Sequence, residues 1–270
     1  MILTPFRYAG SKNKMLPILM EHLSPLLSKS NSFCDVFIGG GSVLLEVAAK
    51  YPTIKLFGND KDKWVSSFWS IVASDDTQKL DELIRRLEAQ PTIELFYKLR
   101  ETPATTDIDY AYRALFFNRT CFSGILSSGP IGGREQKSKY KVDCRYNFQK
   151  LKKKILECNK LLIGRTTIDN VDVMSYYALK DESCVAYCDP PYVAAGKMLY
   201  PEYMTIKQHE QFSKIILSRK KWVLSYDNSD VIKDIYGDTC DIYDAVSNYC
   251  ISGIKKEWSQ KLELIIVPKL

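Results

Sequence analysis

The chain has 270 residues, of which 46% are hydrophobic and 26% charged, so it can bury a full core and is neither a disordered nor a fibrous protein. No apolar stretch approaches the ~20 residues that span a bilayer, and residues 1–16 lack an apolar signal core. The net charge of +6 permits a polyanionic partner. Eight scattered cysteines without a CxxC pair, with only two histidines, favour neither a disulfide framework nor a metal site.

The first half of the chain alternates helical and strand patterns. The segment FCDVFIGGGSVLLEVAAKY predicts a strand, a glycine turn and a helix, and IKLFGND predicts a second strand that ends at Asn59 and Asp60. Apolar residues at a helical spacing predict helices over 15–27, 62–72, 79–100 and 110–119.

Residues 120–147 show no clear period and contain four glycines, which predicts a long, loop-rich insertion. Basic side chains dominate the wider stretch 113–160, with aromatic residues between them and few acids. This pattern favours a nucleic-acid surface. For residues 150–154 alone, a solvated helix face is an equally good interpretation.

After the insertion, strands and helices alternate again. Helices are predicted over 151–161, 171–177 and 206–219, and strands over 166–168, 184–188, 222–227, 241–246 and 262–267. This alternation predicts an α/β protein with a mostly parallel sheet covered on both faces. The last two strands are too close for a helical crossover, so they should be antiparallel at one edge.

Two segments contain candidate functional residues. The glycines of DVFIGGGS, between a strand and a helix, would let a ligand approach backbone N–H groups, and Asp60 at the end of the next strand suits a ribose diol. The alternative is a tight turn without a ligand, because the segment does not match the GxGxxG pattern of dinucleotide-binding turns. In CDPPYV, neither proline can extend a strand ladder, so a stiff loop starts at Asp189.

FRYAGSK, FIGGGS, ND, a basic insertion with NRTCFSG, and DPPY occur in this order, and together they resemble the Dam-like (D12 class) DNA adenine-N6 methyltransferases. The resemblance implies a Rossmann-like fold with a seven-stranded sheet, an antiparallel C-terminal edge hairpin and a target-recognition insertion at about 76–149, between catalytic parts 1–75 and 150–270. It implies site-specific methyl transfer from S-adenosylmethionine to N6 of a flipped-out adenine in double-stranded DNA, without a metal. It also implies a cytoplasmic protein of a bacterial, archaeal or phage-infected cell.

The resemblance also assigns roles to residues. Those implied at the cofactor are Tyr8, Lys12, Phe37, Gly39, Gly41, Ser42, Asp60, Asp172 and Asp189. Those implied in catalysis are Asp189, Pro190, Pro191 and Tyr192. The carboxylate of Asp189 and the Pro190 carbonyl would accept the two hydrogens of the amine, and Tyr192 would stack on the extruded base. A helix N-cap is an equally good interpretation of Asp172.

The residues implied at the DNA are Arg7, Arg119, Phe122, Ser127, Arg134, Lys137, Lys139 and Arg145. In the best-known relatives an arginine that reads guanine stands where this chain has Ser127, so we expect a target other than GATC. Two alternatives remain: cytosine-N4 methylation, for which serine in place of Asp189 is the commoner pattern, and a non-methylating DNA-binding protein with the same fold. A cognate restriction endonuclease could act on the same site without forming a stable complex.

Overall fold

The computed structural model describes residues 4–7, 12–193, 203–249 and 259–269. The chain forms two compact units, each made of several segments. The first unit comprises residues 1–11, 39–52 and 62–170, and the second comprises 12–38, 53–61 and 171–270. Within the described residues, no helix is both long and apolar enough to cross a bilayer.

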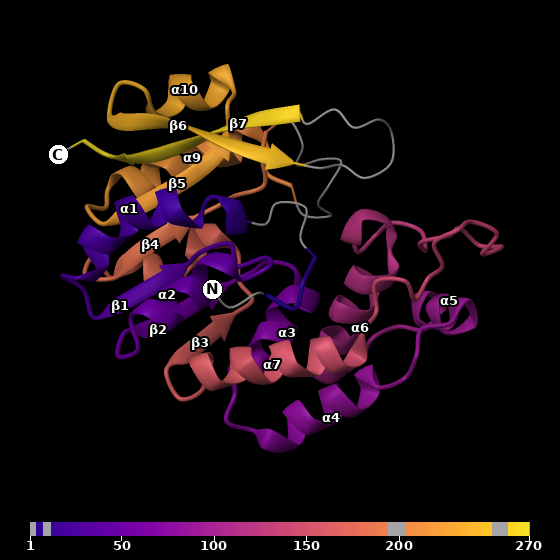
Figure 1. Ribbon diagram of the computed structural model, residues 1–270. Helices are drawn as coiled ribbons and strands as arrows, with labels where there is room; N and C mark the ends of the chain where they lie inside the picture. The colour runs from indigo at the N-terminus through magenta and orange to yellow at the C-terminus, as the bar shows by residue number, and fades with distance from the viewer. Residues whose placement is uncertain (1–3, 8–11, 194–202, 250–258, 270) are drawn as a thin grey trace. The chain divides into compact units, whose positions relative to one another are not determined.

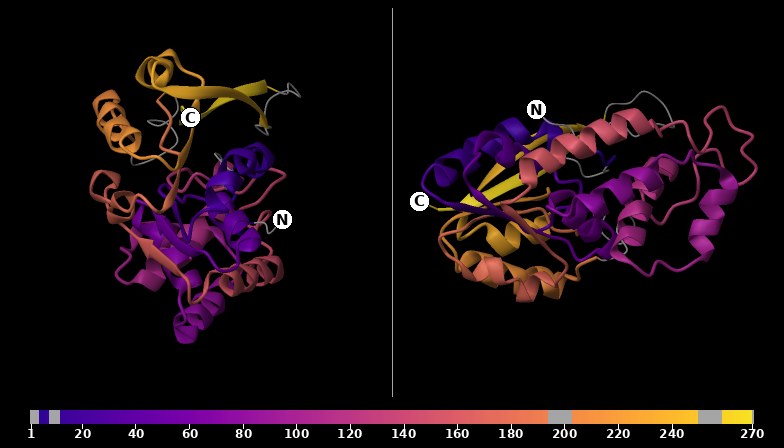
Figure 2. Two further views of the ribbon diagram at one scale, coloured as in Figure 1. Left: turned by 90° about the vertical axis from the view of Figure 1, so that its left-hand side faces the viewer. Right: turned by 90° about the horizontal axis from the view of Figure 1, so that it is seen from below.

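A seven-stranded sheet has the order β3-β2-β1-β4-β5-β7-β6 (Figure 1). Its strands are β1 (Ser32–Asp35), β2 (Lys55–Asn59), β3 (Thr166–Asp169), β4 (Val185–Cys188), β5 (Trp222–Asp227), β6 (Cys240–Tyr249) and β7 (Ser259–Pro268). Strand β1 is parallel to β2 and β4, and β4 is parallel to β5, whereas β7 is antiparallel to both β5 and β6. The yellow hairpin β6–β7 is visible in both views of Figure 2. The predicted α/β sheet and its antiparallel edge are therefore confirmed.

In the second unit, strands β1, β4 and β5 are buried along their whole length because helices cover both faces. Helix α1 (Leu16–Leu27) packs against β4 and β5. Side chains of the opposite face, such as Cys34, Ala186 and Leu224, share a core with α9 (Ile206–Leu217) and α10 (Asp230–Tyr236). Val185 and Tyr187 alternate onto the α1 side.

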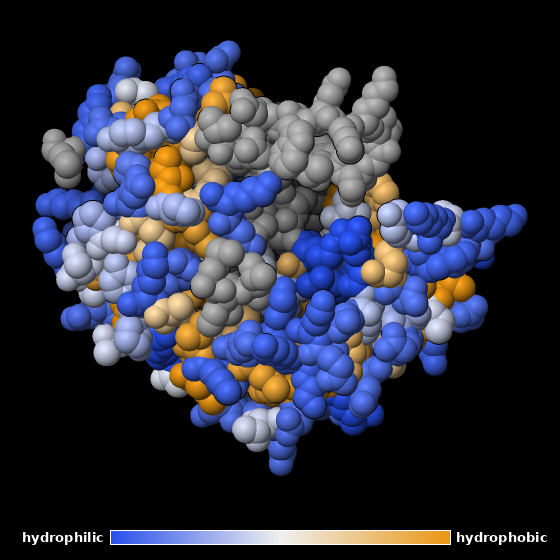
Figure 3. All heavy atoms as spheres, viewed as in Figure 1, coloured by the Kyte–Doolittle hydropathy of each residue, from blue (hydrophilic) through white to orange (hydrophobic). Residues whose placement is uncertain are grey.

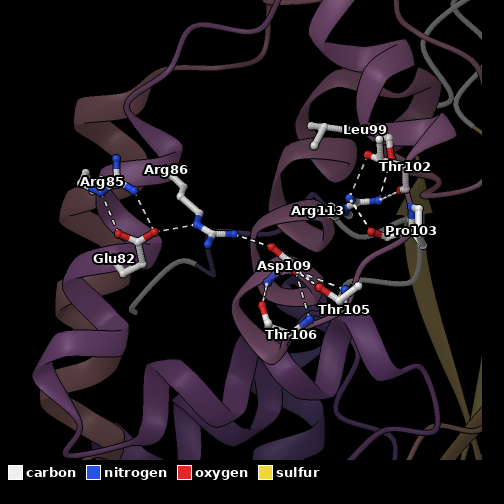
Figure 4. Close-up of polar contacts among 10 residues, drawn as sticks. All are labelled: Glu82, Arg85, Arg86, Leu99, Thr102, Pro103, Thr105, Thr106, Asp109 and Arg113. Carbon is white, nitrogen blue, oxygen red and sulfur yellow. Dashed lines mark hydrogen bonds and ion pairs between the residues drawn. The ribbon is translucent and has the colours of Figure 1, made fainter.

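The first unit is mostly helical, and a polar side chain caps the start of each of its helices from α3 to α7. Its helices are α2 (Ser42–Lys50), α3 (Lys63–Ala73), α4 (Thr77–Leu87), α5 (Ile93–Glu101), α6 (Asp107–Thr120) and α7 (Phe148–Leu162). Helix α3 packs against α6 and α7. A polar network connects α4 to α6, because Arg86 reaches both Glu82 and Asp109, at 2.7 and 2.5 Å (Figure 4). Nearby, Arg113 donates to the carbonyls of Leu99, Thr102 and Pro103.

Several sequence predictions need correction. The helix expected over 79–100 is two helices, because Thr92 caps a new one by accepting from the Leu95 N–H at 3.1 Å. The helix expected over 171–177 is instead a pair of 3-10 turns, η3 (Val173–Ser175) and η4 (Tyr177–Lys180). Helix α10 was not predicted, because seven residues give too few turns for a clear period.

Candidate active site

Several predicted site residues of the second unit lie at the carboxyl ends of the parallel strands. Because β1, β2 and β4 are parallel, Phe37, Asp60 and Asp189 all follow strand ends at one edge of the sheet. Phe37 is partly exposed, and its ring meets Phe212 edge-on with centroids 5.5 Å apart. This edge therefore presents an aromatic ring and two acids.

Hydrogen bonds between Asn59 and Val171 hold the neighbouring Asp172 near the carboxyl end of β2. The Asn59 amide donates to the Val171 carbonyl at 3.1 Å and accepts from the Val171 N–H at 3.0 Å. Asp172 then pairs with Lys61 at 3.3 Å and accepts from the Met174 N–H at 3.0 Å. The N-cap interpretation of Asp172 is thus confirmed, while its side chain stays 45% exposed.

The carboxylate of Asp189 is held from both sides. Its Oδ2 lies 2.6 Å from the ammonium of Lys12, and its Oδ1 accepts from the Ser225 hydroxyl at 2.9 Å. Ser225 is in turn 2.8 Å from the hydroxyl of Tyr187. Burial raises the pKa of Asp189, and the Lys12 ammonium opposes that shift. Lys12 was predicted at the cofactor rather than as a partner of Asp189, and Ser225 was not predicted, since it lies inside an apolar strand.

Tyr192 belongs to the same cluster. Its hydroxyl donates to Glu263 Oε2 at 2.6 Å, and the Lys12 ammonium lies 5.0 Å from its ring centroid. Glu263, on β7, is fully buried and was not predicted; its only sequence signal is an acid within the apolar run LELIIV. Between Asp189 and Tyr192, Pro190 is buried and Pro191 is partly exposed.

The glycine turn lies in the first unit. Gly41 has a φ of +72° and precedes α2, whose first residue, Ser42, is buried. A Cβ on Gly41 would collide with the Trp69 ring, and the Trp69 Nε1–H donates to the Gly39 carbonyl at 2.9 Å. Packing alone thus accounts for a glycine at position 41. The predicted residue Tyr8 lies outside the described residues.

The motif NRTCFSG holds the backbone at Arg7. The Asn118 side chain accepts from the Arg7 N–H at 2.6 Å and donates to the Arg7 carbonyl at 2.8 Å. Gly124 has a φ of +76°, and a Cβ there would lie 2.5 Å from the Arg7 carbonyl oxygen. Burial, followed by the nearby charge of Arg145, lowers the pKa of Arg7. Sequence reasoning singled out this motif but not its function of fixing Arg7.

Most of the other predicted DNA-binding residues are exposed. Ser127, Arg134, Lys137, Lys139 and Arg145 are at the surface, and Phe122 is 58% exposed. At the right of Figure 3, the part of the chain around α5 and the loop that follows α6 carries mainly hydrophilic side chains. Lys137 pairs with Glu135 at 2.5 Å, and the Arg134 guanidinium lies 5.2 Å from the Tyr97 ring centroid.

Arg119 differs from this exposed set. Its guanidinium donates to the Pro5 carbonyl, and burial lowers its pKa to about 10. It therefore supports the N-terminal segment from inside the first unit. In the part of the chain that the structure describes, no cluster of His, Cys, Asp or Glu could hold a metal ion.

A mostly parallel seven-stranded sheet whose fourth strand ends in an acid, two prolines and a tyrosine is the architecture of an α/β methyltransferase. Residues 8–250 match the D12 class N6 adenine-specific DNA methyltransferases, and the chain belongs to this family. It is 27% identical over 210 residues to the type II methyltransferase M.MjaIII of Methanocaldococcus jannaschii, covering 72% of this chain and 70% of that protein. It is 24% identical over 222 residues to the type II methyltransferase M1.LlaDCHI of Lactococcus lactis subsp. cremoris, covering 78% and 72%. Adenine-specific DNA methylation is thus its function.

Proposed function

We propose that the methyl donor is S-adenosylmethionine and that it binds at the carboxyl edge of β1 and β2. Asp60 accepts the ribose hydroxyls, Phe37 offers an apolar ring, and Asp172 lies near the adenine. The site fits a cationic cofactor, because the edge presents carboxylates and a partly exposed aromatic face. The bound cofactor supplies an electrophilic methyl group, and the protein supplies alignment and electrostatics.

In the proposed mechanism, Asp189 and the Pro190 carbonyl accept the hydrogens of the adenine N6 amine. The lone pair of this amine is delocalised into the ring, so the two acceptors return electron density to nitrogen. The Lys12 ammonium opposes the rise in the pKa of Asp189 that burial causes, and Tyr192 stacks on the base extruded from the duplex. The observation that carries this mechanism is that Asp189 is held at 2.6 and 2.9 Å by Lys12 and Ser225.

We propose further that the insertion of about residues 76–149 recognises the target, with Phe122 and the exposed basic side chains at the DNA. Because Ser127 cannot make the two-pronged contact of an arginine with guanine, the target differs from GATC. The relatives are type II methyltransferases, which supports a restriction-modification role beside an endonuclease of the same specificity.

One experiment tests base, position and sequence together. The chain is expressed in a methylation-deficient host, and the host DNA is read by modification-sensitive long-read sequencing. We expect N6-methyladenine in one short motif that is not GATC, since one lost bidentate contact costs ~1 to 3 kcal/mol of discrimination. Modification of every GATC would contradict the proposed target, N4-methylcytosine would contradict the base, and unmodified DNA would favour a non-methylating protein.

A further inference from the structure

Glu263 is a fully buried acid that the proposed mechanism does not use. It lies on β7, where Leu264 and Ile265 beside it are buried and apolar. A carboxylate is costly to bury unless partners compensate for its lost hydration. The identity of those partners indicates its role.

Two contacts of Glu263 lead to the functional groups beside Asp189. Its Oε2 lies 3.7 Å from the Lys12 ammonium and accepts from the Tyr192 hydroxyl at 2.6 Å. Lys12 is at the same time 2.6 Å from Asp189. One buried ammonium therefore lies between two carboxylates, closer to the one that is proposed to act on the base.

This arrangement poses a problem for methyl transfer. Asp189 makes the amine more nucleophilic only if its negative charge is available to accept the amine hydrogens. An ammonium at 2.6 Å neutralises part of that charge. A shift of Lys12 by about one ångström toward Glu263 would bring its ammonium within hydrogen-bond distance of that carboxylate and weaken its contact with Asp189, without leaving the ammonium unpaired.

We propose that Glu263 is a positioning residue, which takes over the Lys12 ammonium while Asp189 accepts the amine hydrogens and which fixes the Tyr192 ring through its hydroxyl. The inference rests on the proposed function of Asp189. It makes Glu263 act on the rate of transfer rather than on binding of the cofactor.

The test is single-turnover methyl transfer to DNA by Glu263→Gln, which keeps the shape and an acceptor for Tyr192 but removes the charge. We expect the transfer rate to fall at least tenfold, with cofactor affinity within threefold of the wild type. Glu263→Asp should recover at least threefold of that rate, because it restores the charge. Glu210→Gln, at an exposed position of α9, is the matched control and should have no effect.

Combining Glu263→Gln with Lys12→Met distinguishes a role of Glu263 through Lys12 from a purely structural role. If Glu263 acts through Lys12, Glu263→Gln should cost less than threefold further in that background; a full additional tenfold loss would overturn the proposal. So would a loss below tenfold in the single variant. If Glu263→Gln does not fold, Glu263→Asp alone should lower the rate at least threefold, and an unchanged rate overturns the role. A wild-type chain that transfers no methyl to adenine would instead overturn the proposed function.

Discussion

The loop 189–192 and the segment 118–147 are ordered in different ways. In the loop, functional side chains are themselves fixed: Asp189 by Lys12 and Ser225, and Tyr192 by the fully buried Glu263. In the segment, buried side chains such as Asn118 hold the backbone, while Phe122 and the basic side chains predicted at the DNA, such as Arg134, are exposed. Transfer chemistry needs one preorganised arrangement of charge, whereas recognition needs side chains that remain accessible to a large partner.

The contrast predicts that substitutions in the loop and in the segment impair different properties of the protein. A change in the loop should stop the reaction without weakening DNA binding. A change in the segment should alter DNA binding or the stability of the first unit, and leave cofactor binding intact. The predictions that follow test this division, beginning with the largest effect.

Asp189→Ala should abolish methyl transfer while cofactor binding stays measurable. Removing one preorganised electrostatic group costs ~100- to 1000-fold in rate. The measurement is single-turnover transfer of labelled methyl together with calorimetry of the cofactor. Asp234→Ala, an exposed position on α10, is the control. Near wild-type turnover of Asp189→Ala would contradict the role assigned to this carboxylate.

Asp60→Ala should weaken cofactor binding and leave DNA binding unchanged. A hydrogen bond to a charged group contributes ~1.5 to 3 kcal/mol, which corresponds to roughly 10- to 150-fold in affinity. Calorimetry with the cofactor measures this loss, again against Asp234→Ala. An unchanged affinity would remove Asp60 from the proposed cofactor site.

Gly124→Ala should lower the free energy of unfolding more than Gly133→Ala. Both glycines have a positive φ, which costs an alanine ~1 to 2 kcal/mol. Only at Gly124 does the added Cβ meet an atom, the Arg7 carbonyl oxygen at 2.5 Å, which should add ~1 to 3 kcal/mol. Denaturant unfolding of the two variants measures the difference. Equal losses would show that the Arg7 backbone can move away, and that the segment is held less tightly than the contacts with Asn118 indicate.

Much of the fold could be predicted from the sequence, because long periodic segments report burial directly. Helix α6 and strand β5 were found in this way, whereas the short turns η3 and η4 were mistaken for one helix and α10 was not predicted, because so few residues give no reliable period. The family resemblance was confirmed because its motifs occur in a fixed order along the chain.

The partners of the site residues were harder to predict. Ser225 and Glu263 come from strands far along the chain, and only strand pairing reveals that they reach 189–192. Arg119 shows a second difficulty: its basic charge predicted a contact with DNA, which stays a prediction, and nothing in the sequence indicated that its guanidinium donates to the Pro5 carbonyl. Charge in a sequence does not distinguish a surface contact from a buried one.

The smallest expected effect concerns the exposed basic side chains of the segment 118–147. If Arg134 and Lys139 contact phosphates, replacing either by alanine should weaken binding to all DNA sequences alike. Each lost phosphate contact should reduce the slope of log affinity against log salt by ~0.9, or roughly threefold in affinity between 50 and 200 mM salt. Lys220→Ala, exposed in the second unit, should leave the slope unchanged. Titrations of a cognate and an unrelated duplex over this salt range give the result. If either variant instead changes which sequence is methylated, its side chain reads a base, and the segment then fixes specific side chains as the loop 189–192 does.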